Sequence, residues 1–389
     1  MSQGLFYEAS YSSLCKDGES VCGDKVEIVK SAGSVMAVLS DGLGSGIKAN
    51  VLSTLTTRIA SYMLKEGSDI DDVVDTIGKT LPICQVRGVA YSTFSIVRLT
   101  PDGLGNIVEF DTPDAFLYRE GTVTKISTRP RKVAQKQVLE GEFAVKDGDH
   151  IFMVSDGVMH AGLGDVMNLG WQWENVAEYL RRAVPKARGD IAQLSRQLTG
   201  VCDQFYAGKP GDDTTAVCIA ARQPRMTAVA IGPPRKRELD AEMVKKFMLK
   251  PGRKIICGGA TGNLFARELG ANMEIDLSTG GDGIPPMARM RGVDMVTEGI
   301  ITLTRALDIL GSVDSGEMTK GGLVGRDAAS LLARALLDSD RLDFLIGRAE
   351  NTAHTDGASL VDYRFKGQAI DAVIRMMRAL GKDVNVTYY

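Results

Sequence analysis

Four short acidic segments in the first 215 residues constrain the fold of this chain more than any other feature. They read Cys22-Gly23-Asp24, Ser40-Asp41-Gly42, Ser155-Asp156-Gly157 and Gly211-Asp212-Asp213. Apolar runs at 35–39 and 151–154 precede two of them, so buried strands would carry these carboxylates to the ends of a sheet. A single Asp-Gly pair indicates only a turn, but four such segments predict a shared site.

The residue types in these segments suit a hard divalent cation. Mg²⁺ and Mn²⁺ prefer carboxylate, backbone carbonyl and water oxygens as ligands. A glycine after a carboxylate lets a backbone carbonyl come close to an ion. The sequence therefore predicts a divalent-metal site that includes Asp41, Gly42 and Asp156.

The order of the segments resembles that of a known family. Residues 1–222 are similar to the metal-dependent serine/threonine phosphatases of type 2C, and within them to the bacterial branch of the sporulation stage II E phosphatase (SpoIIE). The most specific blocks are Ser155-Asp156-Gly157 and 212–217, which reads Asp-Asp-Thr-Thr-Ala-Val. The resemblance implies a four-layer α/β/β/α sandwich of antiparallel sheets, and many strands with two pairs of helical patterns agree with it.

The resemblance also implies a role for each acidic residue. Two ions, Mn²⁺ or Mg²⁺, would be bound, with Asp41 bridging them and Gly42 giving a carbonyl oxygen. Asp156 and Asp212 would hold one ion, and Asp24 would support the other directly or through water. These residues would act in catalysis through a metal-activated water.

The chain departs from the better-known members of the family at three places. Asp213 stands where the family often has an amide, so the ligand stays open between Asp212 and Asp213. No histidine follows Asp41-Gly42 as a general acid, and no arginine precedes Asp24 to bind phosphate. The basic residues nearby are Lys25 and Lys48, which are candidate substitutes for the arginine, and His150 and His160, which we interpret as structural or surface residues.

The implied ligand set defines a hydrolytic mechanism. Two ions held by shared carboxylates lower the pKa of a water, and the hydroxide attacks phosphorus in line while the ions neutralise the phosphate. No covalent phosphoenzyme is then required. The main alternative, a cysteine phosphatase, needs Cys-x₅-Arg, and none of the cysteines at positions 15, 22, 84, 202, 218 and 257 has an arginine six positions on.

Length and composition limit the remaining possibilities. A chain of 389 residues exceeds what one core usually organises, so we expect two domains, at 1–222 and 223–389. The net charge of −3 gives no general attraction to nucleic acid or to an anionic membrane. The lack of a Cys-x-x-Cys pair argues against a structural zinc site and a disulfide scaffold. With no signal peptide or spanning run in the sequence, we expect a cytoplasmic protein.

One helical pattern directly follows the second acidic segment. Residues 46–66 place Ile47, Val51, Leu55, Ile59 and Met63 at successive turns, which predicts an apolar face packed on the core. A tilt of this helix would move Asp41 and Gly42 together, so substitutions on that face are predicted to change metal affinity and turnover. A second helical stretch at 171–206 is split near 185–190.

Residues 223–389 are predicted to form a second α/β domain. Strand patterns at 226–231, 254–257, 272–276, 293–296, 342–346 and 384–388 alternate with helical patterns, one of them with Thr297 as its N-cap. This alternation predicts a mostly parallel, Rossmann-like sheet whose ligands bind outside the carboxyl ends of the strands.

A glycine-rich segment in this second domain has the pattern of a nucleotide site. Gly259-Ala260-Thr261-Gly262 looks like the dinucleotide loop of nucleoside-sugar epimerases, with Gly258 before it. Such a turn exposes backbone N–H groups where Gly262 would open a helix, and Asp276 on the next strand would bind a ribose hydroxyl. The alternative is a tight turn that serves only close strand and helix packing.

The whole sequence predicts a manganese- or magnesium-dependent phosphoserine/phosphothreonine protein phosphatase with a C-terminal sensing or docking domain. The resemblance implies a phosphorylated regulatory protein as partner, a small anti-anti-sigma-like domain being one candidate. A non-catalytic binding module on the same fold is disfavoured because all the carboxylate segments are present. A nucleotide-using enzyme centred on 258–276 is disfavoured because no Tyr-x-x-x-Lys pair or other catalytic residue accompanies the loop.

Overall fold

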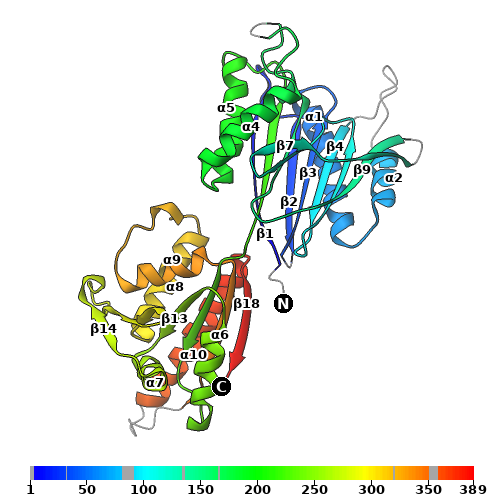
Figure 1. Cartoon of the computed structure of the whole chain (residues 1–389). Coiled ribbons are helices and arrows are strands. Elements are labelled where there is room, and N and C mark those ends of the chain that lie inside the picture. Colours follow the sequence, from blue (N-terminus) through cyan, green and yellow to red (C-terminus); the bar gives the residue numbers. More distant parts are fainter. Residues whose placement is uncertain are drawn as a thin grey trace. The chain divides into compact units, whose positions relative to one another are not determined.

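The structure is a computed structural model that describes residues 4–31, 33–80, 92–133, 136–164, 167–318, 320–349 and 358–389. Cys84 therefore lies outside the described residues. The chain divides into two compact units, Met1–Gln223 and Pro224–Tyr389, called unit 1 and unit 2 below (Figure 1).

Unit 1 contains two antiparallel sheets within its described residues. The five-stranded sheet has the order β1 (Phe6–Leu14), β11 (Thr214–Arg222), β10 (His150–Val154), β6 (Phe116–Arg119) and β7 (Thr122–Lys125). The six-stranded sheet has the order β2 (Asp24–Ser31), β3 (Ser34–Gly42), β4 (Ser92–Leu99), β5 (Leu104–Phe110), β9 (Lys136–Ala144) and β8 (Arg129–Val133). The sequence did not indicate β7 and β8, which are short and mostly exposed.

The apolar faces of these two sheets pack on each other and form the central core of unit 1. Val35, Ala37 and Leu39 of β3 face this core, and so do Ile151 and Met153 of β10. Alternate residues of each strand point the same way, so the intervening residues face the outer helices. The sheet-to-sheet contact therefore decides which strand ends lie near one another.

Helices cover the outer faces of both sheets. Helices α1 (Gly46–Lys65) and α2 (Ile70–Thr80) pack on the six-stranded sheet, and α4 (Trp173–Ala187) and α5 (Ile191–Phe205) on the five-stranded sheet. A short helix, α3 (Asp156–Met159), follows β10. Unit 1 thus has the four layers that the sequence predicts, and α4 and α5 separate at the predicted break.

The predicted core face of α1 is wrong in the first half of the helix, whereas Ile59 and Met63 in the second half pack partly buried against the apolar cluster on the outer face of the sheet. Ile47, Val51 and Leu55 are 69%, 50% and 43% exposed, while the buried side of the helix carries only small residues. Those buried residues are Gly46, Ala49, Ser53, Thr56, Thr57, Ala60 and Ser61. The physical reason is the close approach of α1 to β3, because a Cβ on Gly42 would lie only 2.0 Å from the backbone oxygen of Ala49. Large side chains do not fit in this contact.

The buried polar residues of α1 are satisfied within the helix itself. Thr56 Oγ1 donates to the carbonyl of Leu52 at 2.9 Å, and Ser53 Oγ donates to that of Asn50 at 3.1 Å. Such bonds let Ser and Thr enter a tightly packed helix–sheet contact without an unpaired hydroxyl.

Unit 2 contains a mixed sheet with the order β14-β15-β16-β13-β12-β17-β18 among its described strands. Five of these strands, from β16 to β18, are parallel, and β14 and β15 extend one edge in antiparallel fashion. In chain order the five parallel strands are arranged 3-2-1-4-5. Their bounds are β12 (Met226–Ile231), β13 (Arg253–Cys257), β14 (Met273–Asp276), β15 (Met287–Met290), β16 (Val293–Thr297), β17 (Arg341–Ile346) and β18 (Asp383–Tyr388).

Helices lie on both faces of this sheet. One apolar cluster joins it to α8 (Ile300–Asp314), α9 (Ala328–Asp338) and α10 (Ala358–Ala379). A second cluster joins the opposite face to α6 (Asp240–Leu249) and α7 (Gly259–Leu269). Short 3₁₀ helices occur at Arg237–Leu239, Leu277–Thr279 and Lys320–Gly322.

Two predicted helix starts in unit 2 are wrong. Thr297 is the last residue of β16 and not an N-cap, because the cap of α8 is Gly299. Helix α7 already begins at Gly259, so most of the predicted glycine-rich turn is its first helical turn. None of the described helices combines the length and the apolar character that crossing a membrane requires.

The exposed position of Leu55 on α1 leads to a prediction about stability. We expect Leu55→Ala to change the free energy of unfolding of unit 1 by less than about 0.5 kcal/mol, since this side chain is largely in solvent. Ile77→Ala is the matched control in α2, where the side chain is 2% exposed, and it should cost about 2–5 kcal/mol. Tryptophan fluorescence during urea unfolding measures this, because Trp171 and Trp173 both lie in unit 1. Equal losses in both variants would contradict the exposed position of Leu55.

Candidate metal centre

The acidic residues of all four segments meet at one edge of unit 1. Asp24, the first residue of β2, pairs directly with Asp41 near the end of β3 in the six-stranded sheet. Asp156 follows β10, and Asp212 and Asp213 precede β11, its neighbour in the five-stranded sheet. The packing of the two sheets thus brings together carboxylates that are up to 189 positions apart in the chain.

Burial and mutual repulsion perturb the acidity of these groups. Burial, followed by repulsion from Asp24 and Asp156, raises the pKa of Asp41 to about 9. Burial raises the pKa of Asp24 to about 7. Burial and the charge of Asp156 also raise the pKa of Asp212. A cation at this edge would favour the ionised forms of these carboxylates, which burial and repulsion disfavour in its absence.

Carboxylate oxygens at this edge are buried. Oδ1 of Asp156 is buried and accepts no hydrogen bond from the described residues. The side-chain oxygens of Asp24 are buried too, and the hydroxyl groups of Ser155 and Thr215 are the polar groups nearest to them. Leaving buried carboxylate oxygens unsatisfied is costly unless a cation or donor compensates them. The donor set, which consists of oxygens alone, fits Mg²⁺ or Mn²⁺.

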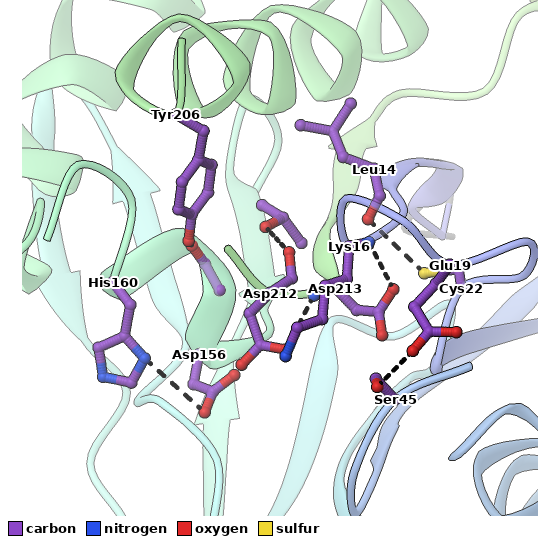
Figure 2. A network of polar contacts seen from close by, with 12 residues as sticks. Leu14, Lys16, Glu19, Cys22, Ser45, Asp156, His160, Tyr206, Asp212 and Asp213 are labelled. Atoms are coloured by element: carbon purple, nitrogen blue, oxygen red, sulfur yellow. Dashed lines mark hydrogen bonds and ion pairs between the residues drawn. The ribbon is translucent and has the colours of Figure 1, made fainter. Parts of the chain in front are cut away.

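The adjacent residues Asp212 and Asp213 have different surroundings (Figure 2). Asp213 is 3% exposed, and its Oδ1 accepts a hydrogen bond from the backbone N–H of Lys16 at 3.1 Å. Asp212 is half-buried, with Oδ1 at 3.0 Å from the N–H of Asp213 and 3.9 Å from Nζ of Lys16. Both carboxylates lie close to Asp41, since each raises its pKa.

Two glycines of the acidic segments are required by close backbone contacts. A Cβ on Gly157 would lie 2.1 Å from the carbonyl oxygen of Asp213, and one on Gly42 would lie 2.0 Å from that of Ala49. Neither position tolerates a side chain without a backbone shift. The glycines thus allow α1 and the strand ends to approach the carboxylates closely.

The sequence did not point to Lys16 or Tyr206 as residues of the site, and it indicated His160 only as a structural or surface residue. Lys16 lies in the loop between β1 and β2, and no sequence pattern marks it. His160 Nδ1 lies 3.9 Å from Asp156 Oδ2, and their i,i+4 spacing could have indicated the contact. Tyr206 Oη donates to the carbonyl of Gly157 at 2.7 Å. Of the residues considered as phosphate ligands, Lys48 is exposed on α1, and Lys25 is partly buried on β2.

The predicted nucleotide residues of unit 2 do not all come together. Gly258, with φ of 115°, directly follows β13, and Gly259 begins α7 with open space where a side chain would stand. Asp276 is on β14, which β15 and β16 separate from β13. Its carboxylate accepts hydrogen bonds from Ser278 and from Arg289. Asp276 is therefore not beside the Gly258 turn, contrary to the ribose-binding prediction.

Two other residues of the turn serve packing. The N–H of Gly262 donates to the carbonyl of Gly258 at 2.9 Å and is not free, contrary to the prediction. A Cβ on Gly262 would lie 3.0 Å from both Met273 and Val296. The buried Thr261 hydroxyl accepts from the N–H of Gly232 at 2.8 Å, which links the loops after β12 and β13.

Comparison with known proteins assigns unit 1 to a class. Residues 31–222 match the family model of Stage II sporulation protein E (SpoIIE). This segment is therefore SpoIIE-like, as the sequence predicts. A relative is Stage II sporulation protein E of Bacillus subtilis (strain 168), which is 27% identical over 149 residues. The match covers 37% of this chain and only 18% of the relative.

Two solved structures illustrate the level of structural similarity to known proteins. The PP2C phosphatase domain of SpoIIE from Bacillus subtilis with a fragment of its regulatory domain is 20% identical, with a TM-score of 0.48. That match covers 57% of this chain and 65% of the other. RsbX in complex with magnesium is 15% identical, with a TM-score of 0.40, and the match covers 55% of this chain and 95% of RsbX.

The close contact between Gly42 and α1 generates a prediction on metal binding. Gly42→Ala should weaken Mn²⁺ binding at least about tenfold, or about 1.4 kcal/mol, because the new methyl group pushes α1 and Asp41 apart. Gly200→Ala in α5 is the control, since a Cβ there meets no atom within 4 Å. Isothermal titration calorimetry with Mn²⁺ measures both. Unchanged Mn²⁺ affinity in Gly42→Ala would show that this contact does not position the predicted ligands.

Proposed function

We propose that this chain is a divalent-metal-dependent phosphatase that hydrolyses phosphoserine and phosphothreonine on a protein. The observation that carries the proposal is the gathering of five carboxylates from two sheets, with a buried oxygen of Asp156 that no described protein group satisfies. The SpoIIE family match over residues 31–222 supports it.

The proposed metal ligands are the residues of the acidic segments. Asp24, Asp41, Asp156, the carbonyl of Gly42 and the Asp212-Asp213 pair would together hold two Mn²⁺ or Mg²⁺ ions. Such ions, when bound, lower the pKa of a water molecule and neutralise the charge of the phosphate. Asp213 is buried and held by the backbone of Lys16, whereas Asp212 is half-exposed and nearer to solvent. Burial alone does not choose between them, so both belong to the proposed ligand set.

The chain itself holds these carboxylates in place. The strand pair β2–β3 fixes Asp24 opposite Asp41. Ser155 Oγ accepts a hydrogen bond from the N–H of Thr215 at 2.8 Å, which locks the turn before Asp156 against β11. Rigid positioning of this kind contributes to catalysis because small displacements of reacting groups reduce the rate strongly.

Lys16 is the proposed phosphate-binding residue in place of the missing arginine. Its ammonium group lies 3.9 Å from Asp212, and the side chain is 38% exposed. It therefore stands at the solvent side of the carboxylate cluster, where a flexible cation can reach a phosphate oxygen. The proposed substrate, a phosphorylated regulatory protein such as a small anti-anti-sigma-like domain in the cytoplasm, rests on the sequence resemblance.

The ligand roles predict the effects of three substitutions. Asp156→Asn and Asp212→Asn should each reduce Mn²⁺-dependent hydrolysis of p-nitrophenyl phosphate below about a tenth of the wild-type rate, equivalent to about 1.4 kcal/mol or more of transition-state stabilisation. The metal-free fold should stay intact or gain stability, since each change relieves like-charge repulsion. Asp213→Asn decides the adjacent pair, because full activity would assign the ligand to Asp212 alone.

The control and the contradicting outcome use the same assay. Asp72→Asn, an exposed residue of α2, should retain full activity, and omission of Mn²⁺ with a chelator should abolish wild-type turnover. Turnover that persists in the chelator, or an Asp156→Asn variant as active as Asp72→Asn, would remove the metal-dependent mechanism.

For unit 2 we infer a Rossmann-like regulatory domain that binds a phosphate-bearing small molecule. The 3-2-1-4-5 order of its parallel strands is that of dinucleotide-binding sheets. The N-terminus of α7 has no side-chain cap, and Gly299 before α8 lies close to Gly258, since a Cβ on Gly299 would lie 3.7 Å from the Cα of Gly258. Two helix N-termini therefore meet at the carboxyl edge of the sheet, where an anion is stabilised.

Gly259→Asp tests this inference. A carboxylate at the first position of α7 is compatible with the helix dipole but should repel an anion, so binding should fall at least about tenfold. Gly311→Asp in α8 adds the same charge in open space away from the α7 N-terminus and should bind normally. Calorimetric titration of the full chain with NAD⁺, NADH, ATP and GTP measures binding. If none binds more tightly than about millimolar, near 4 kcal/mol, the domain is better interpreted as a protein-docking unit.

A further inference from the structure

Two cysteines lie close to each other beside the predicted metal centre, although six residues separate them in the sequence. The Sγ atoms of Cys15 and Cys22 and a carboxylate oxygen of Asp213 all lie within 4.8 Å of one another. These three side chains could therefore offer two thiols and one carboxylate to a single ion. Cys15 is exposed, Cys22 is half-buried and Asp213 is buried, so the group has an entrance from solvent.

The loop between β1 and β2 is folded so that these donors face one another. The thiol of Cys22 lies 3.7 Å from the carbonyl oxygen of Leu14, the residue just before Cys15. Figure 2 draws this contact beside Asp213 and Lys16. Both ends of the loop are therefore close together, and both thiols can bind the same cation without a large movement of the loop.

Backbone contacts from outside the loop hold it in this shape. The N–H of Asp17 donates to the carbonyl of Pro210 at 2.8 Å, which ties the loop to the segment before β11. Nδ2 of Asn50 on α1 donates to the carbonyl of Cys22 at 2.7 Å. A Cβ on Gly23 would lie 2.7 Å from Oδ2 of Asp213, so the glycine lets the carboxylate approach Cys22. The donor arrangement is thus part of the fold.

We propose that Cys15, Cys22 and Asp213 form a binding site for a thiophilic divalent cation, of which Zn²⁺ is the representative. Thiolate ligands select Zn²⁺ over Mg²⁺ and Mn²⁺, which prefer oxygen. Three protein ligands leave one tetrahedral position for water. This site differs in chemistry from the oxygen-only cluster of Asp24, Asp41 and Asp156, and it meets that cluster at Asp213.

Asp213 belongs both to the thiol site and to the proposed metal centre, so occupation of the thiol site would affect catalysis. This step rests on the proposed phosphatase function. A cation held by the two thiolates draws the carboxylate of Asp213 toward Cys22 and away from Asp41. Zn²⁺ therefore inhibits the phosphatase by a route that requires the cysteines. Excess Mn²⁺ does not relieve this inhibition fully, because Mn²⁺ competes poorly for thiolate ligands.

The binding test uses the reduced full-length chain and Cd²⁺ as a spectroscopic probe. Titration should produce a thiolate-to-Cd²⁺ charge-transfer band with a stoichiometry of one, and Zn²⁺ should displace the Cd²⁺. In Cys22→Ser and in the double variant Cys15→Ser/Cys22→Ser, this band should be lost or its affinity reduced at least tenfold. Asp213→Asn should weaken binding, whereas Asp212→Asn should not. An equal band in the wild type and the double cysteine variant would overturn the proposal.

The inhibition test separates this inference from the proposed function. With saturating Mn²⁺, the Zn²⁺ concentration for half-inhibition should rise at least tenfold in Cys22→Ser, with each variant compared with its own uninhibited rate. Equal sensitivity in wild type and Cys22→Ser would overturn the regulatory role. If the chain hydrolyses no phosphate ester, the proposed function fails, while the Cd²⁺ titration still decides whether the thiol site exists.

Discussion

The contact between the two sheets of unit 1 is the interaction on which the site depends. Alternate apolar residues of β3 and β10 are buried against each other, and removal of such surfaces from water is the dominant favourable term in folding. Because this contact sets the relative position of the sheets, it also places the end of β3 near the ends of β10 and β11. Carboxylates that repel one another are held together by apolar packing elsewhere in the unit.

The repulsion between these carboxylates explains why the folded edge should bind a metal ion. The raised pKa of Asp41 and the unpartnered, buried Oδ1 of Asp156 mean that the edge is unfavourable for the ionised protein alone. A bound cation relieves both costs, so the same arrangement that destabilises the apo state favours metal binding. The close contact between Gly42 and Ala49 adds rigidity, since α1 is positioned by backbone against backbone.

The loop between β1 and β2 extends this site beyond the acidic segments. Lys16 fixes Asp213 through its backbone and reaches Asp212 through its side chain. The adjacent thiols of Cys15 and Cys22 place soft ligands next to hard ones. The two cysteines are seven positions apart and form no Cys-x-x-Cys pattern, and they come together because the loop folds back on itself. The spacing of cysteines in the sequence predicts a metal site poorly when tertiary contacts determine the shape of the loop.

Most strands and helices of unit 1, the acidic segments and the resemblance to SpoIIE could be predicted from the sequence alone. Those features are local, since strand periodicity and Asp-Gly turns are written in consecutive residues. The burial of the first half of α1 depends on tertiary contacts, because the close approach to β3 admits small residues there and leaves Ile47, Val51 and Leu55 in solvent. The tertiary structure also decided that Asp276 lies on an edge strand away from Gly258, since β15 turns back antiparallel between β14 and β16. Helix rotation and strand order depend on contacts between distant segments, which no local pattern records.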